Sequence, residues 1–196
     1  MRAWLLLFLV CSGASAETFT YWIQPCNTAE TQCTANDTQL AEWAMDAWQR
    51  SSEGGLTFVK SPLSKARIRI FWASNGNQGL YGEARAIEVE GKPGAELNIR
   101  CDLKALGKKI SEQGSRDLLF RETVIYLTCL HEIGHAIGLP HTRSFNDIMY
   151  SFEYGGNVTE YFGRYRRRLK TRDDIPVQAG LSNEDDRRLA SLYRGK

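Results

Sequence analysis

The chain has 196 residues, of which 42% are hydrophobic and 24% are charged, and its formal net charge is +2 at pH 7. The roughly 180 residues that follow a short leader are enough for one domain with an adequate core. The near balance of acidic and basic residues argues against a general nucleic-acid binder, so we expect no nucleic-acid partner.

The first sixteen residues have the pattern of a secretory signal peptide. Arg2 supplies a positive charge, an apolar run covers 3–10, and Ala14-Ser15-Ala16 forms a cleavage site of small residues. An N-terminal membrane anchor is the alternative, but the run is too short to span a bilayer. We therefore expect a signal peptide at 1–16 and a single domain at 17–196. The product is expected to be a secreted or periplasmic monomer without stable membrane insertion.

Four cysteines follow the leader, and an even number favours disulfides in an exported chain. Three pairings are open. We favour Cys26 with Cys33, which closes a short polar loop, and Cys101 with Cys129, which ties the end of a strand to a long helix. Zinc ligation by cysteine is the alternative, and the absence of C-x-x-C spacing argues against it.

The N-terminal half reads as strands and one amphipathic helix. Asp37 or Thr38 is a candidate N-cap for a helix that runs to Arg50 and ends before Gly54-Gly55. Alternation of polar and apolar residues predicts strands at 18–23, 56–60, 66–72, 81–89 and 96–100, with a loop at 75–79 and a turn at 91–94.

A second, longer helix is expected in the middle of the chain. Ser115 is a candidate N-cap with Asp117 in the first turn, and apolar residues continue to Ile137. Gly138 would end this helix, because glycine enters the left-handed conformation without a Cβ penalty.

The end of this helix carries H-E-x-x-H-x-x-G-x-x-H, from His131 to His141, which contains all three histidines of the chain. A four-residue spacing places His131 and His135 on one helix face, where both can ligate one Zn²⁺. The turn after Gly138 can bring His141 back as a third ligand, leaving an open position for water. Glu132 lies about 100° round the helix, where it can act as a general base on the zinc-bound water. The alternative is a pair of ordinary helix histidines beside a solvated glutamate.

The motif and a methionine that follows it resemble the metzincin signature. Met149 lies in Asp147-Ile148-Met149-Tyr150. Its eight-residue distance from His141 and the tyrosine after it resemble the matrixin branch, the matrix metalloproteinases. The segment L-S-N-E-D-D at 181–186, followed by Leu189, Leu192 and Tyr193, is similar to the terminal helix of matrixins.

The resemblance implies an α+β fold of the metzincin, or zincin-like, type. A twisted mixed sheet would pack on two long helices, with a smaller C-terminal subdomain that ends in a helix. The strand around 81–87 would lie at the sheet edge over the cleft and pair with extended substrate, an instance of β-augmentation. An ordinary core strand is the alternative.

The resemblance also implies roles for single residues. Met149 would form a hydrophobic base beneath the metal, and Asp185 or Asp186 would hydrogen-bond to the segment around it. Leu127 and Tyr150 are candidates for the substrate pocket. Leucine at position 127 suggests an apolar preference for the residue after the scissile bond.

The segment after Met149 departs from a standard matrixin. Some thirty residues separate Tyr150 from Leu181, and they include the basic run G-R-Y-R-R-R-L-K at 163–170. This run is either a solvated loop or a cationic rim on the substrate cleft. The chain also lacks a cysteine-switch motif, an accessory domain and the histidines for a second, structural zinc. Calcium is allowed by the resemblance, but no ligand set stands out.

The sequence therefore predicts an exported zinc-dependent endopeptidase with one catalytic zinc ion and a protein or peptide substrate. Two alternatives remain: a non-catalytic zinc-containing peptide-binding module, and a hydrolase of a non-protein amide such as a cell-wall peptide crosslink. Glu132 favours an enzyme, because a binding module has no need of a general base.

Overall fold

The computed structural model describes residues 16–26, 31–73 and 81–194. The first fifteen residues of the expected signal peptide and the loop expected at 75–79 lie outside this range. Among the described residues, none of the helices combines the length and the apolar character that a membrane span requires.

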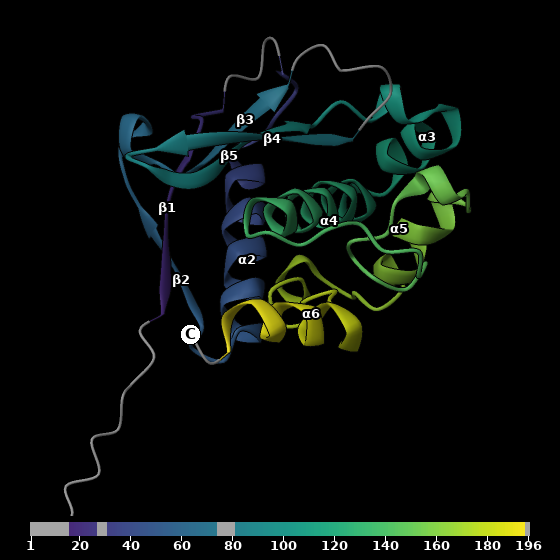
Figure 1. Cartoon of the computed structure of the whole chain (residues 1–196). Coiled ribbons are helices and arrows are strands. Elements are labelled where there is room, and N and C mark those ends of the chain that lie inside the picture. The colour runs from purple at the N-terminus through teal and green to yellow at the C-terminus, as the bar shows by residue number, and fades with distance from the viewer. Residues whose placement is uncertain (1–15, 27–30, 74–80, 195–196) are drawn as a thin grey trace, which may run out of the picture.

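Five strands and five helices make up the described part (Figure 1). The strands are β1 (Glu17–Ile23), β2 (Leu56–Lys60), β3 (Ile68–Ala73), β4 (Gly82–Val89) and β5 (Lys92–Arg100). The helices are α2 (Ala35–Ser51), α3 (Lys108–Arg116), α4 (Leu118–Ala136), α5 (Val158–Arg166) and α6 (Asn183–Tyr193). Short 3-10 turns lie at Leu63–Lys65, Leu103–Leu106, Phe152–Tyr154 and Arg172–Asp174.

The sheet is mixed, with strand order β2-β1-β3-β5-β4. The first four strands in this order are parallel to their neighbours, and β4 is antiparallel to β5. The expected edge position of the strand at 81–87 is confirmed, since among the described residues β4 has β5 as its neighbour on one side and no strand on the other. The start of β4, at Gly82 to Ala84, lines the same cavity as the three histidines.

A tight turn joins β4 to β5. Glu90 and Gly91 both have positive φ, 52° and 75°, which matches a two-residue hairpin whose twist suits antiparallel strands. The turn expected at 91–94 was therefore placed too late, and β5 begins at Lys92 rather than at Glu96. Pro93 is tolerated inside this hairpin because it pairs with Glu88 on the edge strand, close to the turn.

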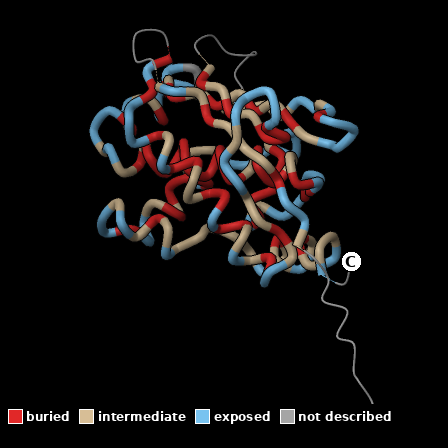
Figure 2. Tube along the Cα trace, turned by 90° about the vertical axis from the view of Figure 1, so that its left-hand side faces the viewer, coloured by how far each residue is buried: buried red, intermediate tan, exposed pale blue. Residues whose placement is uncertain are grey.

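The two long helices lie on one face of the sheet, and the α+β fold is confirmed. In Figure 1, α2 and α4 cross beneath the strands, α6 lies below α4, and α5 lies beside the right-hand end of α4. Trp48 of α2 is fully buried, and its indole Nε1 donates to the Leu130 carbonyl of α4 at 2.8 Å. Figure 2 shows the buried residues concentrated between these layers, so one core joins the sheet and the helices.

The helix starts differ from the sequence expectations. The helix α2 begins at Ala35, and Asp37 is its third residue, where its Oδ2 accepts the backbone N–H of Thr34 at 2.7 Å. The helix expected from Ser115 is broken in two: Ser115 lies inside α3, and Asp117 caps α4 by accepting the N–H of Phe120 at 3.1 Å. Aspartate is among the preferred N-cap residues, which explains why α4 begins directly after Asp117.

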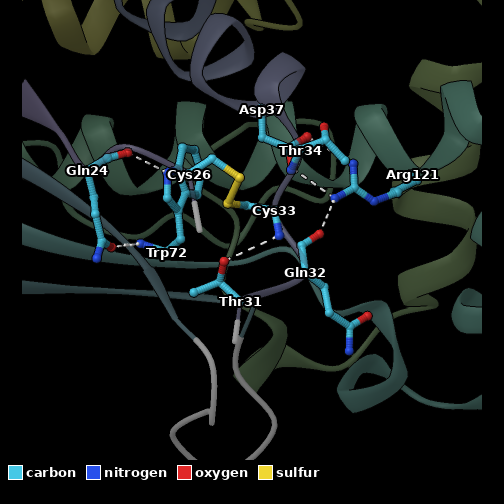
Figure 3. Close-up of a disulfide and its surroundings, with 9 residues drawn as sticks. All are labelled: Gln24, Cys26, Thr31, Gln32, Cys33, Thr34, Asp37, Trp72 and Arg121. Atoms are coloured by element: carbon cyan, nitrogen blue, oxygen red, sulfur yellow. Dashed lines mark hydrogen bonds and ion pairs between the residues drawn. A yellow bond between two sulfur atoms is a disulfide. The ribbon is translucent and has the colours of Figure 1, made fainter. Parts of the chain in front are cut away.

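One of the two expected disulfides forms. Cys26 and Cys33 are bonded, with their Cα atoms 5.8 Å apart (Figure 3). The expected pairing of Cys101 with Cys129 is wrong, because both are free, buried thiols. Burial, followed by the nearby charge of Asp37, raises the pKa of both thiols above the ordinary value. Each therefore behaves as a small buried side chain.

The first half of the basic run, residues 163–166, is helical, and the second half is a turn. Residues 158–166 form α5, whose buried residues include Tyr161, Phe162 and Tyr165. This 3- and 4-residue spacing is the helical pattern, hidden in the sequence among arginines. Arg166 forms an ion pair with Asp117, the N-cap of α4, at 2.8 Å. This ion pair joins α5 to the N-terminal end of α4.

Candidate active site

The helix α4 presents two histidines to one cavity. The Nδ1 atom of His131 lies 2.7 Å from the Ile148 carbonyl, and that of His135 lies 2.9 Å from the Leu139 carbonyl. A carbonyl oxygen can only accept, so in both rings Nδ1 carries the proton and Nε2 offers a lone pair. Burial lowers the pKa of His131 to about 3 and lowers that of His135, so both rings are neutral near pH 7.

A reversal of the chain brings the third histidine to the same place. Gly138 has φ +95°, and the N–H of Leu139 bonds back to the Gly134 carbonyl at 2.9 Å. After the turn, Thr142 pairs with the segment around Met149: its N–H donates to the Met149 carbonyl at 2.8 Å. His141, one residue earlier, is fixed by this pairing.

The three histidines converge on one point. Nε2 of His141 lies 3.2 Å from Nε2 of His131 and 3.0 Å from Nε2 of His135. A tetrahedral zinc with bonds of about 2.0–2.1 Å would hold its nitrogen ligands about 3.3 Å apart. Lone pairs on His131 and His135 that face the same point repel each other unless a cation lies between them. The residues therefore fit a zinc ion with three imidazole ligands.

Glu132 lies beside the histidines but belongs to no group of ligand atoms around them. Its side chain is 6% exposed and lies against the start of β4. A Cβ built on Gly82 would come within 2.7 Å of Glu132 Oε1, so a glycine here leaves room for the carboxylate. Burial, and then the nearby charge of Glu83, raise the pKa of Glu132 to about 8. A divalent cation among the histidines would oppose this rise.

A cavity of about 520 Å³ contains the three histidines and Glu132. Leu127 and Tyr150, expected from the sequence at the substrate pocket, both line it. One wall is the start of the edge strand β4, at Tyr81 to Ala84. The cavity is thus bounded by an open strand edge on one side and by the helix of the histidines on the other.

A further part of the cavity lining was not predicted from the sequence. It comes from the segment after the methionine and from α5, and its residues are Ser151, Phe152, Glu153, Val158, Tyr161 and Phe162. The signal was present in the apolar spacing of Val158, Tyr161 and Phe162, but the surrounding arginines suggested a loop. Tyr81 closes the wall by packing on Phe152 and Phe162, with ring centroids 5.8 and 5.2 Å away.

The segment of Ile148 and Met149 contacts both the histidine helix α4 and the terminal helix α6. Met149 is fully buried, and its sulfur lies where a side chain on Gly134 would begin. Asp185 of α6 accepts the N–H of Ile148 at 2.9 Å and that of Ser182 at 2.8 Å. The expected contact from the terminal helix is therefore made by Asp185, whereas Asp186 bonds to Ser51. Ile148 in turn orients His131 through its carbonyl.

Fold and site together define a zinc metallopeptidase of the metzincin class, with three histidines positioned for one metal ion. The family model described as Matrixin matches residues 14–175. The chain belongs to the matrixin family, whose members are metalloendopeptidases. A comparison with curated proteins finds no match to it.

Proposed function

We propose that the chain is an exported zinc endopeptidase that hydrolyses peptide bonds with Glu132 as general base. The observation that carries this proposal is the meeting of three imidazole Nε2 atoms and one carboxylate in a single cavity beside an open strand edge. A structural zinc site would need no empty position, no adjacent carboxylate and no cavity of this size.

His131, His135 and His141 would hold the ion through Nε2, each of the first two oriented by a backbone carbonyl at Nδ1. Zinc supplies, when bound, polarisation of the scissile carbonyl and a lowered pKa for the attacking water. Glu132 takes the proton of that water and delivers it to the leaving amine. Met149 supports the histidine helix from below and is not assigned as a ligand.

Substrate would bind as an extra strand beside β4. The edge of β4 offers backbone donors and acceptors in the cavity wall, so an extended peptide can pair with it while its scissile bond lies over the histidines. Leu127 and Tyr150 would contact the side chain that enters the cavity. An apolar side chain suits this position, because Leu127, Val158 and Phe162 line the same space.

Export is proposed from the leader pattern at 1–16, with residues 17–196 as the folded domain. The Cys26–Cys33 disulfide agrees with an oxidising compartment. We propose secretion or delivery to a periplasm, and a monomeric protein.

The test uses the chain from Glu17 to Lys196 loaded with zinc, on a library of quenched fluorescent peptides. Glu132→Gln is expected to keep its zinc and its fold and to lower the rate of cleavage about 10²- to 10⁴-fold. Glu112→Gln, which removes a carboxylate from α3 far from the cavity, serves as the matched control and should cleave like the unaltered chain.

Zinc removal by a chelator should abolish cleavage, and added zinc should restore it. Folded, zinc-loaded protein that cleaves no peptide would contradict the endopeptidase proposal. Binding of peptides without cleavage would then favour the binding module, and release of amines from crosslinked cell-wall fragments would favour the non-protein amide.

A further inference from the structure

Two arginines of the basic run lack an acidic partner within the described part of the chain. Arg166 and Arg167 pair with Asp117 and Glu160, but no ion pair is made by Arg164 or Arg168 with any described residue. Arg164 lies in the last turn of α5 and Arg168 in the turn that follows it, and both line the same pocket.

Both guanidinium groups are nevertheless held in place. Arg164 lies over the Tyr161 ring, 4.5 Å from its centroid, and its Nη1 donates to Asn146 Oδ1 at 3.0 Å. Arg168 lies 5.7 Å from the centroid of Tyr165, and its Nη2 donates to Gln178 Oε1 at 2.8 Å. The hydrogen-bond partners are neutral amides, so each guanidinium group is positioned without a direct ion pair, although Glu160 lies close enough to interact with the charge of Arg164. Side chains already ordered in this way lose less entropy when they bind an anion.

The two arginines line a separate pocket of about 240 Å³. Its remaining wall is largely apolar and includes Leu127, Ile148 and Leu181. Leu127 and Tyr161 also line the cavity of the histidines, so the two spaces adjoin at these residues. At roughly 30 Å³ per water, the volume corresponds to about eight water molecules, enough for a carboxylate with a short hydrocarbon chain.

The charges of the two spaces are opposite. Among the described residues that line the histidine cavity there are three glutamates and no lysine or arginine. The arginines of the basic run therefore do not line the histidine cavity; Arg164 and Arg168 line the neighbouring pocket, which also contains Leu127. A negatively charged ligand would therefore be attracted to the pocket of Arg164 and Arg168 and repelled by the glutamates of the histidine cavity.

We propose that Arg164 and Arg168 form a second binding site, for a carboxylate carried on a short apolar chain. The guanidinium groups would donate charge-assisted hydrogen bonds to the carboxylate oxygens, and the hydrocarbon part would lie against Leu127, Ile148 and Leu181. The site shares Leu127 with the proposed substrate pocket, but its existence does not depend on the role of Glu132.

The test is an NMR titration of the zinc-loaded chain with hexanoate at constant ionic strength. Hexanamide, which has the same chain without the charge, and inorganic phosphate, which has charge without the chain, are titrated in parallel. Hexanoate is expected to shift the side-chain N–H signals of Arg164 and Arg168 and the backbone signals of Gly180 and Leu181. Hexanamide and phosphate are expected to bind at least about fivefold more weakly.

Arg168→Gln removes one charge from the rim of the pocket and should weaken hexanoate binding about fivefold or more. Arg164→Gln should do the same, and Arg167→Gln, on the same segment but paired with Glu160, is the matched control that should bind like the unaltered chain. Because a carboxylate can also bind zinc, the position of the shifts decides the result. Shifts confined to the histidine cavity, or equal binding of hexanoate and phosphate, would overturn the proposal.

Discussion

Gly134 shows how a single residue in the helix α4 serves the metal site. It lies between His131 and His135 in sequence, and the sulfur of Met149 occupies the place where its side chain would begin. Glycine in a helix interior costs about 0.5–1 kcal/mol relative to alanine. Because Gly134 has no side chain, Met149 can pack directly on the helix backbone beneath the histidines.

Gly134→Ala is therefore expected to destabilise the fold, by about 1–3 kcal/mol, because Met149 and the neighbouring Trp48 must move to admit a methyl group. The free energy of unfolding in urea measures this effect. Gly163→Ala is the matched control. Its Cβ would meet the ends of flexible side chains, Arg167 at 3.3 Å and Glu160 at 4.0 Å, so alanine there should raise stability by about 0.5–1 kcal/mol. A stable Gly134→Ala protein would contradict the packing argument.

At the scale of elements, the edge strand β4 depends on its single neighbour β5. Glu96 of β5 joins them, because its carboxylate binds Arg85 of β4 and also accepts from Arg69 of β3 at 3.1 Å. These hydrogen bonds, the one from Arg85 first, lower the pKa of Glu96 in the folded protein. The pairing therefore anchors the strand that bounds the proposed substrate cleft.

This pKa shift predicts a pH-dependent effect for Glu96→Gln. A carboxyl group with a lowered pKa in the folded state binds fewer protons there than in the unfolded state. Its stabilising contribution is then present above the unfolded value, near 4.5, and is lost as the pH falls through the lower folded value. Glu96→Gln should lower the urea midpoint at pH 7 and have a smaller effect at pH 3. Glu88→Gln, exposed on β4, should change the midpoint little at either pH.

The helices illustrate where sequence patterns succeed and fail. The long apolar helix that ends at Gly138 was predictable, because periodicity and a glycine stop are local signals. Its start was misplaced, since Ser115 and Asp117 both offer caps and only the fold selects between them. The helix α5 was missed because Arg164 and Arg166 interrupt its apolar pattern, and both are held by residues outside the helix, Asn146 and Asp117.

At the scale of the whole molecule, one buried ion pair joins three distant segments. Arg121 of α4 binds Asp37 of α2 at 2.8 Å, and the same guanidinium donates to the Gln32 carbonyl beside the disulfide at 3.1 Å (Figure 3). Asp37 is fully buried and also accepts the N–H of Thr34. Arg121 in this way connects Gln32, next to the disulfide, with both long helices.

Arg121→Ala is expected to cost about 3–5 kcal/mol, because it leaves the carboxylate of Asp37 buried without its cation. Arg187→Ala removes an arginine from an exposed pair on α6 and should cost less than about 0.5 kcal/mol. Thermal unfolding of both variants tests the difference. A double variant, Arg121→Ala with Asp37→Asn, should recover part of the loss if the unpaired charge is the cause.

The sequence by itself determined the metal-binding motif, because four-residue helical spacing and a glycine stop are properties of the local chain. It also predicted the mixed α+β fold and the edge strand, through resemblance to the matrixins and through alternation of side chains. The tertiary structure alone decided that Cys101 and Cys129 stay unpaired, where the long helix begins, and which residues after the methionine line the cavity. Those outcomes depend on contacts between segments distant in sequence, such as Arg166 with Asp117 and Tyr81 with Phe152, and no local pattern encodes such contacts.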